Sequence, residues 1–147
     1  MNNSNNVKEI KILDQYLTEK NLRKTPERYI ILKYIYTIDS HFDIDYLYNH
    51  INKKEQISKA TIYNNLTLFS SAKLINQLHF NGNKVLYEKS LNKTQHDHLI
   101  CSDCGKIVEF CDPRIQSIIN GIEKITNFQV HSHALNVYGT CKSKNCQ

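Results

Sequence analysis

The sequence predicts an α+β protein built from two small domains, and three observations support this prediction. Apolar residues recur at helical spacing through most of residues 7–75. An Asn-Gly pair at 81–82 then separates two short alternating segments, which is typical of a β-hairpin. The rest of the chain is rich in short strands around one helical segment, and its alternating apolar residues predict a longer strand over 128–139. Because the polar segment 90–95 (SLNKTQ) separates the two patterns, we expect domains at 1–89 and 96–147.

Four helices are expected before the hairpin. Apolar side chains recur at three- and four-residue spacing over residues 7–20, which predicts the first of them. Thr25, Asp43 and Ser58 stand where the next three helices would begin, and their side-chain oxygens are expected to cap exposed backbone amides. Pro26 suits the first helical position because that position needs no N–H donor.

The predicted hairpin, formed by segments 75–80 and 84–89, follows the fourth helix directly. Helices followed by such a hairpin describe a winged helix-turn-helix domain, in which the last helix enters the DNA major groove. That helix has a polar face able to bond phosphates and base edges, made by Ser58, Lys59, Thr61, Tyr63, Asn64 and Asn65. Taken alone, the same residues fit an ordinary solvated helix face equally well.

Composition limits the classes of function. The chain has 147 residues and a formal net charge of +5, which suits contact with a polyanion without requiring it. No apolar run approaches the roughly 20 residues needed to span a bilayer. The first residues, MNNSNNVKEI, have neither the basic start nor the apolar stretch of a signal peptide, so a cytoplasmic protein is expected.

The five cysteines are expected to be reduced, so spaced pairs favour metal binding over disulfides. Cys101 and Cys104 form a C-x-x-C pair followed by glycine, and Cys141 and Cys146 form a wider pair near the end. Four thiolates make a closed tetrahedral zinc site, the alternative being four unrelated thiols. Cys111, in the apolar context EFCDP, is expected to be a small buried hydrophobic residue rather than a ligand.

Two histidines precede the C-x-x-C pair. On a strand, His96 and His98 would point to one face and Asp97 to the other. Nitrogen and carboxylate ligands with open positions suit iron, manganese or zinc, although paired surface histidines are often only solvated. The candidates to complete such a site are His41, Glu88 and Glu109, whereas His50 and His79 have no ligand-rich neighbours.

Four segments together resemble one protein family. In order and spacing, 25-TPER-28, 60-ATIYNNLTLF-69, 96-HDHLICSDCGKIVEF-110 and 138-YGTC-141 resemble the ferric uptake regulator (Fur) family of metal-dependent transcription factors. The resemblance implies a homodimer with an amino-terminal winged helix-turn-helix DNA-binding domain and a carboxy-terminal α/β dimerisation domain. It also implies structural Zn(II) on Cys101, Cys104, Cys141 and Cys146, and a regulatory metal on His41, Glu88, His96, His98 and Glu109.

The resemblance also implies how the protein meets DNA. The family's base contacts fall on Tyr63, which can meet thymine methyl groups, and on Arg23, which can enter a narrow A·T-rich minor groove. We add Arg28 to the expected contacts with a double-stranded A/T-rich operator. A third family metal site would use Gln95, Asp97, Gln116 and His133. We expect this third site to be weak or absent because two of its ligands are replaced by glutamine.

The sensed signal has several interpretations. Glu109 stands where the peroxide-sensing branch of the family typically has aspartate, which favours a repressor that senses Fe(II). A peroxide-sensing or zinc-sensing regulator is the alternative, with Mn(II) or Zn(II) as alternative regulatory ions. Two alternatives belong to other classes of protein. One is a zinc hydrolase with Glu109 as general base, although the sequence has no H-E-x-x-H helix. The other is an interaction module that zinc stabilises and that has no affinity for DNA.

Overall fold

The computed structural model describes residues 6–79, 85–91 and 94–142. The chain divides into an N-terminal unit, Met1–Asn92, and a C-terminal unit, Lys93–Gln147, and each unit is treated by itself. Cys146 and the Asn-Gly turn expected at 81–82 fall outside the described residues. Within the described ranges, no helix is long and apolar enough to cross a membrane.

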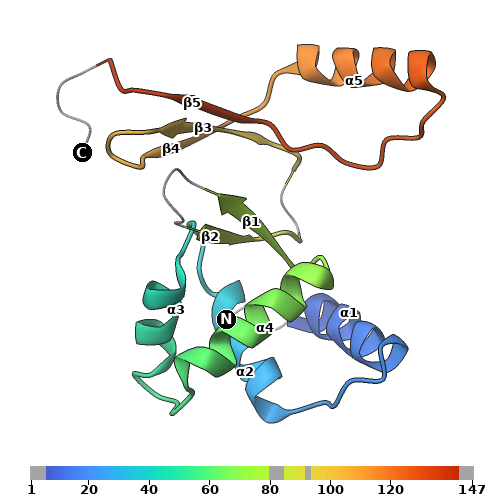
Figure 1. The fold of residues 1–147 in the computed structure, drawn as a ribbon. Coiled ribbons are helices and arrows are strands. Elements are labelled where there is room, and N and C mark those ends of the chain that lie inside the picture. Colours follow the sequence, from blue (N-terminus) through green and yellow to red (C-terminus); the bar gives the residue numbers. More distant parts are fainter. Residues whose placement is uncertain (1–5, 80–84, 92–93, 143–147) are drawn as a thin grey trace. The chain divides into compact units, whose positions relative to one another are not determined.

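The N-terminal unit consists of four helices followed by a hairpin (Figure 1). Its elements are α1 (Asn6–Glu19), α2 (Pro26–Tyr36), α3 (Ile44–Ile51), α4 (Lys59–Ser71), β1 (Ile75–His79) and β2 (Val85–Lys89). The two strands pair antiparallel, with Ile75 opposite Lys89 and His79 opposite Val85. The expected order of four helices and a hairpin is therefore present.

Capping residues start two of these helices as expected, and the third differs. The Asp43 carboxylate accepts a hydrogen bond from the Tyr46 amide at 2.8 Å, and the Ser58 hydroxyl accepts one from the Thr61 amide at 3.1 Å. The Thr25 side chain makes no capping hydrogen bond, so that prediction is wrong. The Arg28 amide instead donates to the Thr25 backbone carbonyl oxygen at 3.1 Å, so the Thr25 hydroxyl is not needed as its acceptor.

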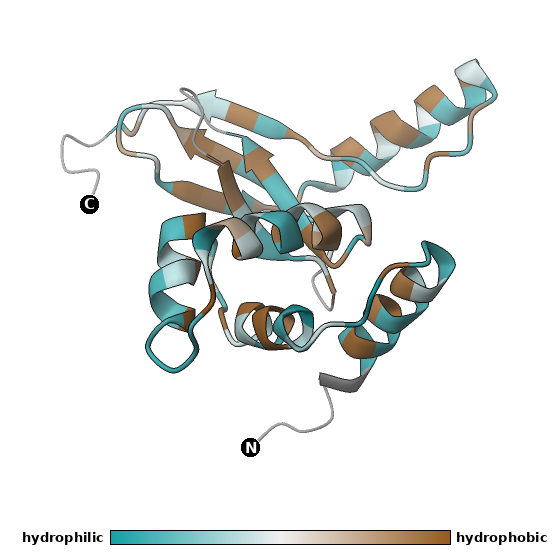
Figure 2. Cartoon of the chain, turned by 60° about the horizontal axis from the view of Figure 1, so that its bottom comes forward, coloured by the Kyte–Doolittle hydropathy of each residue, from teal (hydrophilic) through white to brown (hydrophobic). Residues whose placement is uncertain are grey.

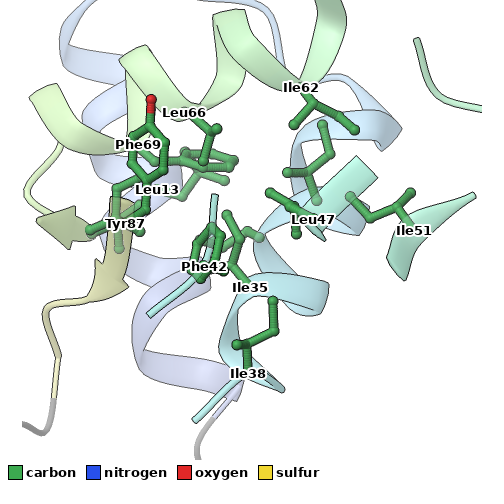
Figure 3. Close-up of a cluster of buried hydrophobic side chains, with 14 of the residues drawn as sticks. Leu13, Ile35, Ile38, Phe42, Leu47, Ile51, Ile62, Leu66, Phe69 and Tyr87 are labelled. Carbon is green, nitrogen blue, oxygen red and sulfur yellow. The ribbon is translucent and has the colours of Figure 1, made fainter. Parts of the chain in front are cut away.

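One hydrophobic cluster holds the N-terminal unit together (Figure 3). All four helices and both strands contribute buried side chains, among them Leu13, Ile31, Ile35, Leu47, Ile51, Ile62, Leu66, Phe69, Ile75 and Tyr87. Burying one such side chain fully stabilises a fold by about 1.5–3 kcal/mol. Because the cluster is continuous, it fixes α4 and β2 in one body.

The C-terminal unit contains a three-stranded sheet and one helix (Figure 1). Its elements are β3 (Asp97–Cys101), β4 (Ile107–Phe110), α5 (Pro113–Thr126) and β5 (Asn136–Gly139), with sheet order β4-β3-β5. β3 pairs antiparallel with β4 and parallel with β5.

The strand expected over 128–139 is shorter than predicted. Only Asn136–Gly139 is a strand, since β3 has five residues and its pairing with β5 begins at His98 opposite Asn136. Immediately before β5, the Leu135 amide donates to the side chain of Asp97 at 3.0 Å instead of to the backbone of β3. The alternating apolar pattern predicted extended backbone but could not show where the partner strand ends.

Apolar side chains are arranged differently in the C-terminal unit. α5 has no buried residue, although hydrophobic positions recur along it (Figure 2). Cys111, expected to be buried, is exposed. The prediction failed because the apolar sequence around Cys111 has no covering layer among the described residues of this unit.

Candidate metal centres and DNA-binding face

Three cysteines meet at one end of the C-terminal sheet. Cys101 ends β3, Cys104 lies in the turn before β4, and Cys141 follows β5; their sulfur atoms all lie within 4.8 Å of one another. The Cys104 and Cys141 sulfurs are 3.9 Å apart. Gly105 makes the turn possible because its φ of +73° lies in the left-handed region, and its amide donates to the Cys101 carbonyl oxygen at 2.9 Å.

The surroundings of Cys101 favour its thiolate form. Hydrogen bonds from the backbone of Cys104 and then of Asp103 lower the pKa of the Cys101 thiol to about 6. The thiolate is therefore the main form at neutral pH, and the thiolate is the form that binds metal. A set of sulfur donors at the ends of paired strands fits zinc in a closed structural site.

The N-terminal unit brings one histidine and one carboxylate together. His41 Nε2 lies 3.4 Å from Glu88 Oε2, although 46 positions separate the residues along the chain. The second carboxylate oxygen of Glu88 accepts a hydrogen bond from the Asn76 side-chain amide at 3.1 Å. An imidazole nitrogen beside a carboxylate oxygen suits Fe(II), Mn(II) or Zn(II).

The C-terminal unit brings together two histidines and a carboxylate. The rings of His96 and His98 meet edge to face with centroids 4.9 Å apart. His96 Nε2 lies 3.8 Å from Glu109 Oε1, and His98 stands opposite Glu109 in the β3–β4 pairing. His96 Nδ1 lies 2.8 Å from the Thr94 carbonyl oxygen. Because that oxygen only accepts, Nδ1 carries a proton, and in the neutral ring Nε2 then keeps the lone pair that a metal needs.

The residues of the expected third site make contacts within the C-terminal unit. Asp97 Oδ1 lies 3.5 Å from His133 Nε2 and also accepts the Leu135 amide. The Gln95 side-chain amide donates to the His133 carbonyl oxygen at 2.9 Å. Gln116 donates to Asn120 on the same helix at 2.8 Å. The contacts of Asp97 and Gln95 connect the segment before β5 to β3 and to the residues just before it, whereas the Gln116 bond stays within α5. A weak or absent third metal site stays a prediction.

The expected DNA-contacting residues differ in their exposure and in the contacts that their side chains make. Tyr63 and Asn64 are exposed on α4. Lys59 forms an ion pair with Asp45 of α3 and lies 6.0 Å from the ring centroid of Tyr48. Two expected contacts have structural partners as well, since the Ser58 hydroxyl caps α4 and the Arg28 guanidinium donates to the Arg23 carbonyl oxygen.

Sequence reasoning missed several residues that support these sites. Asn76, which binds Glu88, could have been found by centring the hairpin on Gly82, because that register pairs the two residues. Asp45, the partner of Lys59, gave no comparable signal. The pairing of Phe42 with Tyr87 also had no sequence signal, since Phe42 lies outside any named strand.

The chain is similar in sequence and structure to proteins of one known family. Residues 19–138 match the ferric uptake regulator family. The chain is 34% identical to the peroxide-responsive repressor PerR of Staphylococcus epidermidis over 127 residues, covering 86% of this chain and 83% of that protein. Among solved structures, the Helicobacter pylori ferric uptake regulator superposes with a TM-score of 0.76 at 26% identity, covering 91% and 89%. The Vibrio cholerae ferric uptake regulator superposes at 0.69 with 34% identity, covering 87% and 98%.

Proposed function

The chain belongs to the ferric uptake regulator family of metal-dependent transcriptional regulators, and on that premise we propose that it is a peroxide-responsive repressor. Regulators of this family bind operator DNA as dimers and are not enzymes, so the zinc hydrolase alternative is set aside. We propose a cytoplasmic homodimer that binds a double-stranded A/T-rich operator.

We propose that Cys101, Cys104, Cys141 and Cys146 hold a structural Zn(II) ion. The meeting of three sulfur atoms within 4.8 Å supports this assignment, as does the lowered pKa of the Cys101 thiol. In small domains such an ion contributes directly to folding, because the unfolded chain has no preformed site. The zinc is therefore part of the fold rather than the sensor.

We propose that one regulatory ion takes ligands from both units, namely His41 and Glu88 together with His96, His98 and Glu109. The physiological ion in this proposal is Fe(II), with Mn(II) as a substitute that also supports DNA binding. The close pairing of His41 with Glu88 carries the proposal, because these ligands lie in the unit that also contains α4. An ion that binds the DNA-competent arrangement more tightly than other arrangements shifts the population toward it.

DNA recognition in this proposal rests on the N-terminal unit. Exposed Tyr63 and Asn64 would meet base edges, with Thr61 beside them, while Arg23 would enter the minor groove. Ser58, Lys59 and Arg28 would contact the phosphate backbone, which positions the protein but carries no sequence information. Lys59 would exchange its exposed pairing with Asp45 for a phosphate.

Response to peroxide is supported by the relatives, since the S. epidermidis protein is a peroxide-responsive repressor and matches most of this chain. Held by the proposed ligands, Fe(II) would supply the one-electron reduction of hydrogen peroxide to hydroxide and hydroxyl radical, becoming Fe(III), and the radical would be the oxidant of nearby side chains. His41 and His96 are the ring ligands we expect to be oxidised as a result. Iron sensing without oxidation is the second candidate, favoured by Glu109 in place of the aspartate expected for the peroxide-sensing branch.

The test is anaerobic binding of the zinc-loaded protein to an A/T-rich palindromic duplex with Fe(II) or Mn(II), followed by a peroxide pulse and mass spectrometry of the histidine peptides. We expect the Fe(II) form to lose DNA binding as His41 or His96 gains oxygen, and the Mn(II) form to be unaffected. Unchanged binding of the Fe(II) form, without added oxygen, would contradict the peroxide proposal and favour iron sensing. The double variant His96→Ala, His98→Ala should lose metal-stimulated binding while remaining folded.

A further inference from the structure

Two buried aromatic residues stand directly beside the metal-ligand pair of the N-terminal unit. Phe42 follows His41, and Tyr87 precedes Glu88. The Phe42 amide donates to the Tyr87 carbonyl oxygen at 3.0 Å, and the Tyr87 amide donates to the Phe42 carbonyl oxygen at 2.8 Å. These two hydrogen bonds form an isolated antiparallel bridge, here named the Phe42–Tyr87 bridge.

The side chains of the bridge lie in the hydrophobic cluster (Figure 3). Their rings stack with centroids 5.9 Å apart and an interplanar angle of 26°, and both residues are buried. Ring packing in a close-packed core allows few side-chain conformations, so the stack fixes the two backbone segments against each other.

The ligand pair flanks this bridge. In extended chains successive side chains point to opposite sides, so with Phe42 and Tyr87 in the core, the adjacent His41 and Glu88 point away from it. The 3.4 Å spacing of His41 Nε2 and Glu88 Oε2 is thus set by backbone that the stacked rings hold in place. Asn76 binds the other carboxylate oxygen and so orients Glu88 further.

A second connection between the same segments is weaker. Lys89 Nζ lies 2.7 Å from Asp39 Oδ1, which joins β2 to the residues before His41. The Asp39 side chain is 94% exposed, and exposed ion pairs contribute little to stability. The Phe42–Tyr87 bridge is therefore the main connection that sets the spacing of the ligand pair.

We propose that Phe42 and Tyr87 are positioning residues for the regulatory metal, acting through His41 and Glu88 without touching the ion. This inference rests on the proposed function, in which that pair ligates the regulatory ion. Residues that orient metal ligands typically change metal affinity by 10–100-fold when they are altered. The stack thereby makes metal affinity depend on the core that also holds α4.

The test compares Mn(II) affinity of the zinc-loaded, full-length protein with that of variants, measured by electron paramagnetic resonance of the unbound ion. Phe42→Leu and Tyr87→Leu remove the stack, and we expect each to weaken Mn(II) binding about tenfold or more. Tyr87→Phe keeps the stack and should bind within about twofold of the unaltered protein. Co(II) absorption spectra should change for the two leucine variants and not for Tyr87→Phe.

Phe69→Leu is the matched control, because it also removes a buried ring from the same cluster but lies on α4, outside the two backbone segments that the bridge pairs. It should lower stability to urea without changing Mn(II) affinity. Equal weakening of Mn(II) binding by Phe69→Leu would overturn the proposal, since the effect would then be general loss of stability. If Phe42→Leu does not fold, Phe42→Met retains most of the volume without the ring and gives the same comparison.

Glu88→Gln separates this inference from the proposed function. If Glu88→Gln binds Mn(II) as tightly as the unaltered protein, the ligand assignment itself is wrong and the positioning role fails with it. If Glu88→Gln loses binding while Phe42→Leu and Tyr87→Leu retain it, the ligand assignment stands and the positioning role is overturned.

Discussion

The two units use their apolar residues in different ways. In the N-terminal unit, side chains from four helices and two strands converge on one continuous cluster. In the described part of the C-terminal unit, the buried hydrophobic residues are Ile100 and Cys101, while α5 carries the exposed side chains Ile118, Ile122 and Ile125. The first unit has a core of its own, and the second presents apolar surface outward.

This difference indicates that different forces hold the two units. A small unit without a large core needs a metal ion, a partner or both to remain folded. The cysteine cluster supplies a site for the metal, and the exposed face of α5 suits the second copy expected of a dimeric family. The comparison therefore predicts that a given kind of substitution has a different effect in each unit.

The largest expected effect is loss of the proposed structural zinc. Cys101→Ser should unfold the C-terminal unit, because zinc binding in small domains contributes on the order of 10 kcal/mol. The four helices of the N-terminal unit should keep their structure, as followed by circular dichroism together with zinc content. Cys111→Ser is the control, since Cys111 lies outside the cluster and should not alter zinc content. A folded C-terminal unit in zinc-free Cys101→Ser would contradict the claim that this unit depends on zinc for its stability.

A matched pair of phenylalanines tests where the core lies. Phe69 is fully buried and Phe128 is 74% exposed. Phe69→Ala should lower the free energy of unfolding by about 3–5 kcal/mol. Phe128→Ala should change it by less than about 0.5 kcal/mol when urea unfolding is measured at low protein concentration. Similar costs for the two substitutions would mean that the C-terminal unit has a core that the described residues do not show.

Substitutions on α5 test whether its apolar face meets a second copy. Ile118 and Ile125 lie two turns apart and are 62% and 86% exposed. The double variant Ile118→Asp, Ile125→Asp should weaken self-association at least 100-fold, or about 2.8 kcal/mol, in analytical ultracentrifugation. The control places aspartates at Gln116 and Asn120, on the opposite side of the helix. An equal loss in the control, or no loss in the test variant, would rule out this face as the interface.

The smallest effects concern helix starts within the N-terminal unit. Asp43→Ala removes a side-chain acceptor for the Tyr46 amide and should cost about 1 kcal/mol in urea unfolding. Thr25→Ala removes a hydroxyl that makes no capping bond and should cost less than about 0.5 kcal/mol. If both cost the same, the difference in capping between α2 and α3 has no energetic consequence.

The sequence allowed much of the fold to be predicted because its signals were local. Helical spacing, the caps at Asp43 and Ser58, and the alternating hairpin segments each depend on residues close together in the chain. The failures were nonlocal. The length of β5 depends on where β3 offers partners, and the exposure of Cys111 depends on a covering layer that the described residues of this unit do not supply.

The candidate sites were likewise predictable where their signals were local, and not where distant segments meet. Residue type and spacing identified Cys101, Cys104 and Cys141, whose sulfur atoms do meet. The close approach of His41 to Glu88 was implied by the family resemblance, because nothing local connects the two residues. The Phe42–Tyr87 bridge, which sets their spacing, could only be recognised once the paired backbone was seen.

The most direct test of the difference between the units is hydrogen exchange by mass spectrometry on the full-length protein with zinc bound and after zinc removal. We expect β3, β4, β5 and α5 to lose protection when zinc is removed, while α2 and α4 exchange as slowly as before. Loss of protection in both units together, or unchanged protection of the C-terminal sheet, would contradict the conclusion that the N-terminal unit relies on its own core and the C-terminal unit on zinc.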